Sequence, residues 1–176
     1  MEKTVIIING AGGVGKDTLC GMAGRHFKVR NVSSITPIKK IAEVYGGWNG
    51  EKDAKARKFL ADLKRLFVEY NDLPFRYLCE EYEKFMQGED EILFVQIREG
   101  EEIEKFKNWV KTPCITLLIT RFQIDQVLWG NSSDDNVGSF QYDHTFHNDS
   151  SLEAAEAEFC GFLTGIFREP GFGEGQ

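Results

Sequence analysis

The residues best suited to chemistry lie near the start of the chain, where an apolar run ends in a glycine-rich turn that carries a lysine. The turn reads Gly-Ala-Gly-Gly-Val-Gly-Lys-Asp-Thr over residues 10–18. This is the form of a phosphate-binding loop, G-x-x-x-x-G-K-[ST], except that Asp17 stands where serine or threonine is expected. Glycines let backbone N–H groups approach a phosphate chain, and the next helix adds partial positive charge at its N-terminus. We expect phosphate binding by Gly10, Ala11, Gly12, Gly13, Val14, Gly15, Lys16, Asp17 and Thr18.

The elements around this turn favour that interpretation over a chance glycine-rich turn. Residues 4–9 form a β-branched run typical of a strand buried on both faces, and residues 15–27 have helical spacing. Apolar runs and amphipathic patterns then alternate, which predicts an α/β fold with a parallel sheet and right-handed crossovers. Further strands are predicted at 31–35, 91–97, 114–120 and 142–147, and further helices from residue 36, over 51–71 and 74–88, around 103–110 and over 150–167.

The chain reads as one domain over residues 1–170, with a frayed tail at 171–176. The two helical patterns between about 51 and 88 exceed a minimal crossover, so we predict a helical insertion beside the sheet. Residues 121–141 form a long polar stretch without a clear period, and such loops in compact domains are usually functional. This stretch is the candidate lid loop. The last helix is predicted to begin with a capping box of Ser150 and Glu153.

Composition narrows the class of protein. The net charge of −7 argues against general nucleic-acid binding and against an anionic membrane surface. No apolar run is long enough to span a membrane, and the first residues show no signal-peptide pattern. The four cysteines form no C-x-x-C pair, which favours reduced thiols in a cytoplasmic protein over a disulfide or a zinc site. A phosphorylated ligand must then be met by local positive charge.

Four stretches resemble a known family. Besides the loop, they are residues 32–39 (Val-Ser-Ser-Ile-Thr-Pro-Ile-Lys), 47–53 (Gly-Trp-Asn-Gly-Glu-Lys-Asp) and 94–103 (Phe-Val-Gln-Ile-Arg-Glu-Gly-Glu-Glu-Ile). They resemble the bacteriophage-type deoxynucleoside monophosphate kinases and their P-loop kinase relatives, over most of the chain up to about residue 121. The resemblance implies a three-layer P-loop kinase fold, with a five-stranded parallel sheet in the order 2-3-1-4-5 and helices on both faces. It also implies ATP as the phosphoryl donor and transfer to a small acceptor, in nucleotide metabolism.

Phosphoryl transfer needs several cations to converge on donor and acceptor. Lys16 would serve the donor. Arg98 follows a buried strand, at the edge where open α/β sheets bind ligands, and the resemblance implies that it holds the acceptor phosphate. A rim salt bridge to Glu99 or Glu102 is the alternative. Arg121 also follows a strand and begins the candidate lid loop, where it is either a lid arginine or a surface residue. The catalytic candidates are therefore Lys16, Arg98 and Arg121.

Further residues are candidates for the acceptor pocket. Helix 51–71 has a basic side on which Arg57 is the first candidate ligand, although such charge runs are more often solvated faces. Lys39 is a similar candidate. Ser34 lies between a strand end and a helix start, where its hydroxyl can reach an acceptor. The basic side consists of Lys55, Arg57, Lys58, Lys64 and Arg65.

The aspartate in the loop suggests an unusual metal site. In many P-loop enzymes, Mg²⁺ is held by a loop hydroxyl and by an aspartate at a strand end. Residues 91–97 end without an aspartate, so the Asp17 carboxylate could replace it, being a hard oxygen ligand suited to Mg²⁺. Alternatively, Asp17 only complements the positive end of its helix. That alternative is weaker, because a carboxylate beside a triphosphate is repelled unless a cation intervenes.

These observations predict an enzyme that transfers a phosphoryl group from Mg·ATP to a nucleoside monophosphate, including deoxynucleotides. The Lys-Asp pair is also similar to that of animal-type phosphomevalonate kinase, so a kinase of another phosphorylated metabolite is an alternative. A nucleotide-binding regulatory protein without an acceptor is a third. The strand-end arginines favour an acceptor site over a switch, and no N-K-x-D-like guanine motif follows the strand at 114–120. The sequence leaves the oligomeric state open.

Overall fold

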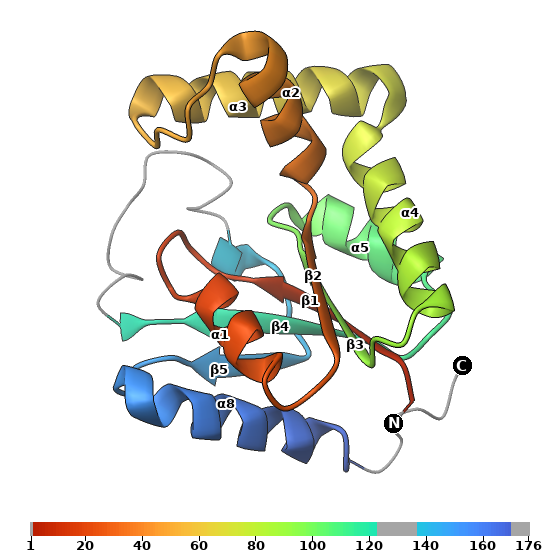
Figure 1. Ribbon diagram of the computed structural model, residues 1–176, viewed down its shortest axis with the longest axis vertical. Coiled ribbons are helices and arrows are strands. Elements are labelled where there is room, and N and C mark those ends of the chain that lie inside the picture. The colour runs from red at the N-terminus through yellow and green to blue at the C-terminus, as the bar shows by residue number, and fades with distance from the viewer. Residues whose placement is uncertain (1, 123–136, 170–176) are drawn as a thin grey trace.

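A five-stranded parallel sheet forms the centre of the protein (Figure 1). The computed structural model describes residues 2–122 and 137–169. The strand order is β2-β3-β1-β4-β5, which confirms the predicted sheet and its order. Each interior strand pairs in parallel with both neighbours, so all five carboxyl ends meet at one edge of the sheet. The strands are β1 (Thr4–Asn9), β2 (Val29–Ser33), β3 (Ile92–Gln96), β4 (Cys114–Thr120) and β5 (His144–His147).

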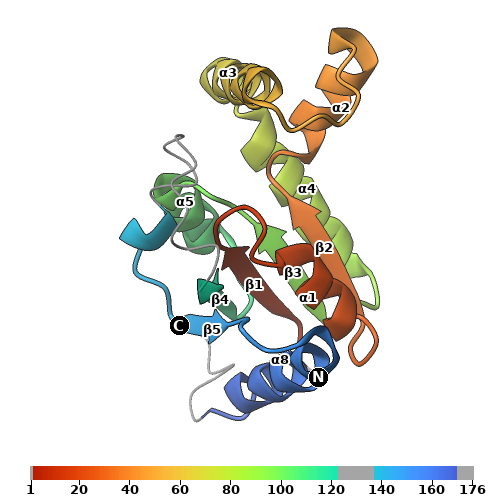
Figure 2. The same cartoon turned by 90° about the vertical axis from the view of Figure 1, so that its left-hand side faces the viewer.

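Helices cover both faces of the sheet, giving the three predicted layers (Figures 1 and 2). Along β1, side chains alternate between the faces. Ile6 and Ile8 join a core with helices α1 and α8, whereas Val5 and Ile7 join a core with α4 and α5. The helices are α1 (Lys16–Ala23), α2 (Thr36–Gly46), α3 (Ala54–Asn71), α4 (Leu73–Gln87), α5 (Gly100–Trp109) and α8 (Leu152–Ile166), with a short 3₁₀ turn, η1, at Val137–Ser139.

The helical segment predicted at 51–88 divides into two parts that pack differently. Helix α4 belongs to the sheet core, because its Leu78, Tyr82 and Phe85 are buried against β1 and β3. Helix α3 has one buried residue, Ala56, and lies with α2 beyond the edge of the sheet (Figure 2). The projecting part therefore consists of α2 and α3, and it stands above the carboxyl ends of the strands.

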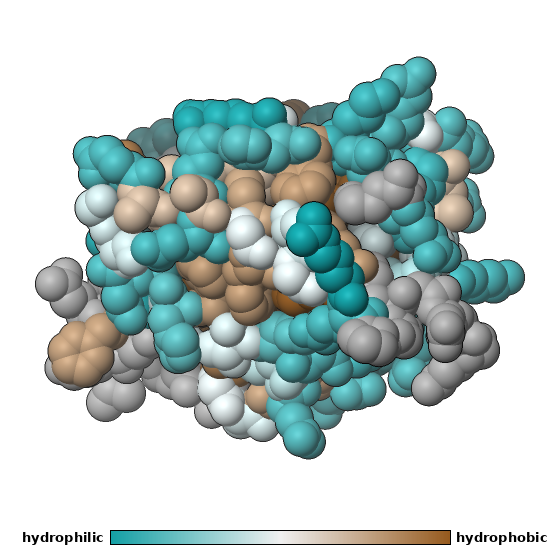
Figure 3. All heavy atoms as spheres, turned by 90° about the horizontal axis from the view of Figure 1, so that it is seen from below, coloured by the Kyte–Doolittle hydropathy of each residue, from teal (hydrophilic) through white to brown (hydrophobic). Residues whose placement is uncertain are grey.

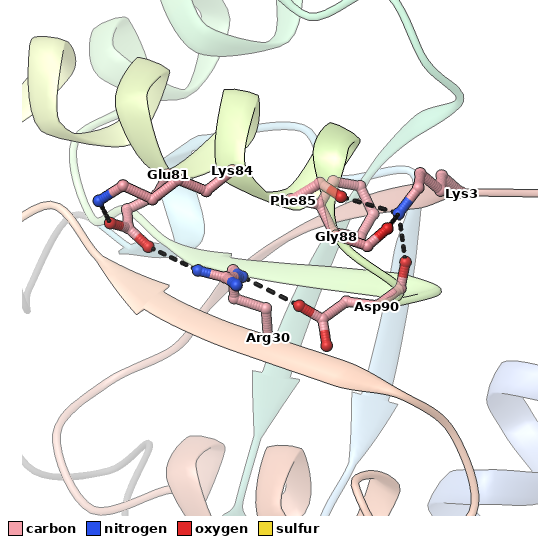
Figure 4. Close-up of polar contacts among 7 residues, drawn as sticks. All are labelled: Lys3, Arg30, Glu81, Lys84, Phe85, Gly88 and Asp90. Carbon is pink, nitrogen blue, oxygen red and sulfur yellow. Dashed lines mark hydrogen bonds and ion pairs between the residues drawn. The ribbon is translucent and has the colours of Figure 1, made fainter.

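A polar cluster fixes α4 to the opposite edge of the sheet (Figure 4). Lys3 Nζ donates to the backbone oxygens of Phe85, Gly88 and Asp90 at 2.7, 2.9 and 2.7 Å. The contacts to Phe85 and Gly88 supply a donor to carbonyls at the C-terminus of α4, where a helix lacks intrahelical donors, and the contact to Asp90 holds the turn that follows. Arg30, at the start of β2, pairs with Glu81 at 3.1 Å and with Asp90 at 3.0 Å. The orientation of α4 is thus set at the edge away from the phosphate-binding loop.

Helix α8 closes the other face. Its N-cap is Ser151, whose hydroxyl accepts from the Ala154 N–H, so the predicted cap at Ser150 was wrong by one residue. Phe159 and Leu163 point into the core, and the exposed side includes small residues such as Gly161. Seen from this side, apolar atoms gather in the middle of the face and hydrophilic ones surround them (Figure 3). Among the described helices, none is long and apolar enough to cross a membrane.

Candidate phosphate-binding and phosphoryl-transfer site

The glycine-rich loop connects β1 to α1 at the carboxyl edge of the sheet. Gly10, Gly13 and Gly15 have φ values of 154°, 88° and 95°, which side chains rarely tolerate. Two of them also permit close packing. A Cβ at Gly10 would lie 2.5 Å from the Ile119 backbone oxygen, and a Cβ at Gly15 would lie 2.7 Å from Nδ2 of Asn148. The glycines therefore let the loop turn tightly against β4 and against the residue that follows β5.

Lys16 is the first residue of α1, and its side chain turns back over the loop. Its Nζ donates to the backbone oxygens of Gly10 at 2.5 Å and Ala11 at 3.0 Å. The ammonium charge and the positive end of the α1 dipole are thus directed to one place. That combination suits a phosphate chain. Asn148 supports the loop from the β5 side, since its Nδ2 donates to the Val14 backbone oxygen at 2.8 Å.

Asp17 lies beside the ends of β3 and β2. Its Oδ1 accepts from Nε2 of Gln96 at 2.5 Å and, at 3.4 Å, from Nδ2 of Asn31. The same Gln96 nitrogen donates to Oδ1 of Asn31 at 3.1 Å. Oδ2 of Asp17 makes no hydrogen bond with any residue that the structure describes. Its oxygens fit a Mg²⁺ site, because Mg²⁺ is usually held by one or two carboxylates together with substrate phosphates.

Asn9, the last residue of β1, fixes the start of the loop from within the core. It is fully buried, and its Oδ1 accepts from the Gly10 N–H at 2.8 Å. Its Nδ2 donates to the Arg98 backbone oxygen at 3.0 Å and to the Tyr142 hydroxyl at 2.8 Å. That hydroxyl donates in turn to the Val137 oxygen at 2.8 Å. Burial raises the pKa of Tyr142 to about 12, so the phenol stays protonated at neutral pH.

The two strand-end arginines lie on either side of β1. Strand β1 pairs with both β3 and β4, opposite Gln96 and Leu118 near their ends. Arg98 and Arg121 follow these two strands, and both side chains are exposed. The structure therefore places both at the edge where the loop begins, although the long loop after Arg121 falls largely outside the described residues.

The other predicted acceptor residues are more scattered. Ser34 is buried beside the end of β3, where its N–H donates to the Gln96 oxygen at 3.1 Å. Lys39 is exposed on α2, with its ammonium 5.9 Å from the centre of the Trp48 ring. Arg57 lies in the first turns of α3, and its Nε donates to the Lys52 oxygen at 2.8 Å. Ser34 thus lies at the sheet edge, whereas the two basic residues belong to the projecting helices.

The basic side of α3 is largely engaged with carboxylates. Lys58 and Arg65 pair with acidic residues one turn on along the same helix. Lys64 instead bridges to α5, contacting Glu99 at 2.6 Å and Glu102 at 2.9 Å. Burial raises the pKa of Glu102 to about 7, with a further contribution from Glu99, against the opposing effect of Lys64. This contact joins the projecting helices to the residues that follow Arg98.

A cavity of about 180 Å³ lies beneath the α3–α4 corner, next to that contact. Apolar side chains of α3 and α4 form one wall, and polar groups of α5 and Ser34 form the other. A wider hollow of about 610 Å³ borders the described end of the candidate lid loop at Ser139, Phe140 and Gln141. The cavity is lined by Ser34, Val68, Asp72, Pro74, Phe75, Leu78, Glu101, Glu102 and Lys105.

Sequence reasoning missed three side chains that organise the site: Asn9, Gln96 and Asn31. Asn9 and Gln96 are the last residues of β1 and β3, so their position at strand ends was a usable signal. Most of their partners were not visible, because four of these contacts join residues 65 to 133 positions apart in the chain. The order of the strands had to be known before these amides could be assigned to the loop.

Comparison with known proteins supports the fold. No protein-family model and no curated protein sequence matches the chain. Among solved structures, dephospho-CoA kinase from Campylobacter jejuni is 13% identical with a TM-score of 0.56, over 94% of this chain and 98% of that one. TT1252 from Thermus thermophilus is 16% identical with a TM-score of 0.50, over 94% and 99%. At these identities the likeness concerns architecture, and with the strand order 2-3-1-4-5 it shows that this chain has the P-loop kinase fold.

Proposed function

We propose that the protein transfers the γ-phosphoryl group of Mg·ATP to a small phosphorylated acceptor, a nucleoside or deoxynucleoside monophosphate. The observation that carries this proposal is the loop between β1 and α1. Three of its glycines have positive φ, and Lys16 reaches across it to the Gly10 and Ala11 oxygens. Such a loop suits the triphosphate of a nucleotide, with the lysine reaching the β- and γ-phosphates.

The residues at the sheet edge take separate roles in this proposal. Lys16 and the N-terminus of α1 bind the donor phosphates. Arg98 binds the acceptor phosphate, and Arg121 compensates charge on the group in transfer, where convergent cations lower the barrier. Ser34 hydrogen-bonds the acceptor beside the end of β3. Lys39 and Arg57 lie on the projecting helices and not at the sheet edge, so they are secondary candidates.

Magnesium, when bound, would neutralise charge between the phosphates, and Asp17 is the residue proposed to hold it. The exposed carboxylate at the start of α1 supports this role, since the hydrogen bonds from Gln96 and Asn31 engage Oδ1 and not Oδ2. The chain itself contributes orientation. It holds the donor phosphates at the loop and the acceptor at the neighbouring strand end, so that the two reacting groups meet in line.

The proposal is tested by measuring ADP release with a panel of ribo- and deoxynucleoside monophosphates and with phosphomevalonate. We expect turnover that depends on a nucleoside monophosphate and that falls by at least ~100-fold in Lys16→Ala, as expected when charge compensation in the transition state is lost. The matched control is Lys40→Ala, an exposed lysine of α2. Turnover with phosphomevalonate alone would contradict the choice of acceptor. Tight ATP binding without acceptor-dependent turnover would contradict the kinase.

A further inference from the structure

We infer that Gln96, assisted by Asn31, positions the Asp17 carboxylate to bind the metal. In the usual P-loop metal site the loop carries a neutral hydroxyl and the strand end carries the carboxylate. Here the two are exchanged, with the carboxylate on the loop and a neutral amide at the strand end. The inference rests on the proposed function. Its basis is geometric. Gln96 Nε2 lies 2.5 Å from Asp17 Oδ1 and 3.1 Å from Asn31 Oδ1, so one amide group joins α1, β3 and β2.

The exchange concerns which element carries the carboxylate, the loop or the end of the neighbouring strand. In the usual arrangement the loop supplies a hydroxyl and the end of the neighbouring strand supplies an aspartate. Here the loop supplies Asp17, and β3 ends in Gln96, opposite Ile8 of β1. A side-chain hydrogen bond joins the two elements here, with its donor, Gln96, on the strand and its acceptor, Asp17, on the loop. One negative charge is present in either arrangement.

Glutamine is the residue type that this exchange requires. A glutamate at position 96, which has the same length, would bring two carboxylates to about the present separation of 2.5 Å and make them repel each other. The Gln96 amide donates instead. Its nitrogen is held by Asn31 as well as by Asp17, which fixes the end of the amide that faces the carboxylate. Oδ1 of Asp17 is thereby engaged, and Oδ2 is presented to the metal.

The hydrogen bonds among Asp17, Gln96 and Asn31 contribute little to the stability of the fold. Asp17 and Asn31 are exposed and Gln96 is only partly buried. Solvent can replace a hydrogen bond between such groups at small cost. Partners that orient a metal ligand, by contrast, typically change metal affinity by about 10- to 100-fold when they are removed. Variants of Gln96 should therefore lose metal affinity without a comparable loss of stability.

The test is a Mn²⁺ titration of the full-length protein by electron paramagnetic resonance, in the presence of a non-hydrolysable ATP analogue. We expect Gln96→Met to weaken Mn²⁺ binding by about 10-fold or more, while the thermal midpoint and the metal-free affinity for the analogue stay unchanged. The matched control is Gln87→Met, an exposed amide at the end of α4, which should bind Mn²⁺ as the wild type does. The double variant D17T/Q96D rebuilds the usual arrangement and should bind Mn²⁺ more tightly than D17T alone.

The outcomes distinguish this inference from the proposed function. If Asp17→Asn weakens Mn²⁺ binding but Gln96→Met binds as the wild type does, the positioning role of Gln96 is wrong and the metal role of Asp17 survives. If Asp17→Asn also binds Mn²⁺ as the wild type does, the metal role assigned to Asp17 is wrong. A D17T/Q96D protein that binds no better than D17T would contradict the exchange of partners.

Discussion

Nε2 of Gln96 lies 2.5 Å from Oδ1 of Asp17, so the last residue of β3 donates a hydrogen bond to the second residue of α1. Asn9 makes the matching connection from the start of the loop, through its bond to the Arg98 oxygen. The phosphate-binding loop is thus fastened to the end of β3 at both of its ends. Since Arg98 lies two residues after the end of β3, the same strand end positions both the proposed donor site and the proposed acceptor site.

The first prediction concerns Asn9. We expect Asn9→Ala to lower the free energy of unfolding by about 2–4 kcal/mol, because it leaves the Gly10 N–H and the Arg98 carbonyl without their buried partner. Urea unfolding measures the change. The matched control is Asn108→Ala, an exposed residue of α5, which should be neutral or slightly stabilising. An Asn9→Ala protein as stable as the wild type would show that this residue does not hold the loop.

The second prediction compares two glycines that lie six residues apart. Gly15→Ala should destabilise by about 1–3 kcal/mol, because Gly15 has φ 95° and a Cβ there would lie 2.7 Å from Nδ2 of Asn148. Gly21→Ala should instead stabilise by about 0.5–1 kcal/mol, because Gly21 lies inside α1 with open space around the added Cβ. Thermal unfolding of the two variants tests the pair. Equal shifts of the same sign would contradict the loop geometry.

The third prediction concerns the pH dependence of stability. The pKa of Glu102 is raised from 4.5 to about 7 in the folded protein, mainly by burial. Between these values the folded state holds a proton that the unfolded state has released, so stability falls as the pH rises through this window. Replacing Glu102 with glutamine removes the titration, and the stability of E102Q should fall less over the same range. Urea unfolding at several pH values measures the two slopes.

The control for this pH effect lies on the same helix. Glu104 is exposed on α5, and Glu104→Gln should retain the wild-type slope. The groups that face Glu102 are Lys64, on α3, and Glu99, just before α5, and both are unchanged in the comparison. A Glu102→Gln protein with the wild-type slope would mean that Glu102 is ionised in the folded state throughout this range.

The fourth prediction tests the cluster at the far edge of the sheet. Lys3→Met should lower the free energy of unfolding by about 1–3 kcal/mol, because three backbone oxygens at the end of α4 and in the turn that follows it lose their charged donor. Lys40→Met, at an exposed lysine of α2, is the control. The affinity for the ATP analogue should not change, since Lys3 lies at the opposite end of the strands from the loop. A loss of nucleotide affinity without a loss of stability would contradict this assignment.

Much of the fold could be predicted because the signals were local. The apolar runs of β1, β3 and β4 marked strands that are buried on both faces, and the loop after β1 had a recognisable motif. The order of strands was implied by family resemblance and is confirmed by the pairing. Boundaries were less accurate. Helix α1 ends at Ala23 and not at 27, and β2 begins two residues earlier than predicted, at Val29.

The contacts within the site could not be predicted, because they depend on how distant segments meet. Asn9, Gln96 and Asn31 are ordinary polar residues in the sequence, and only the pairing of β2, β3 and β1 brings their amides to the loop. The different packing of α3 and α4 could not be predicted for the same reason. Helix α4 has a buried face because it lies on the sheet, whereas the apolar spacing of α3 leaves residues such as Leu66 exposed.

The most direct test follows the labelled γ-phosphate of ATP after incubation with the protein, Mg²⁺ and a mixture of deoxynucleoside monophosphates. Separation of the products by chromatography shows where the label goes. We predict label in a nucleoside diphosphate, with transfer by Lys16→Ala reduced at least ~100-fold and normal transfer by Lys40→Ala. Label found only in inorganic phosphate, or retained in ATP although ATP binds, would contradict phosphoryl transfer to a nucleoside monophosphate.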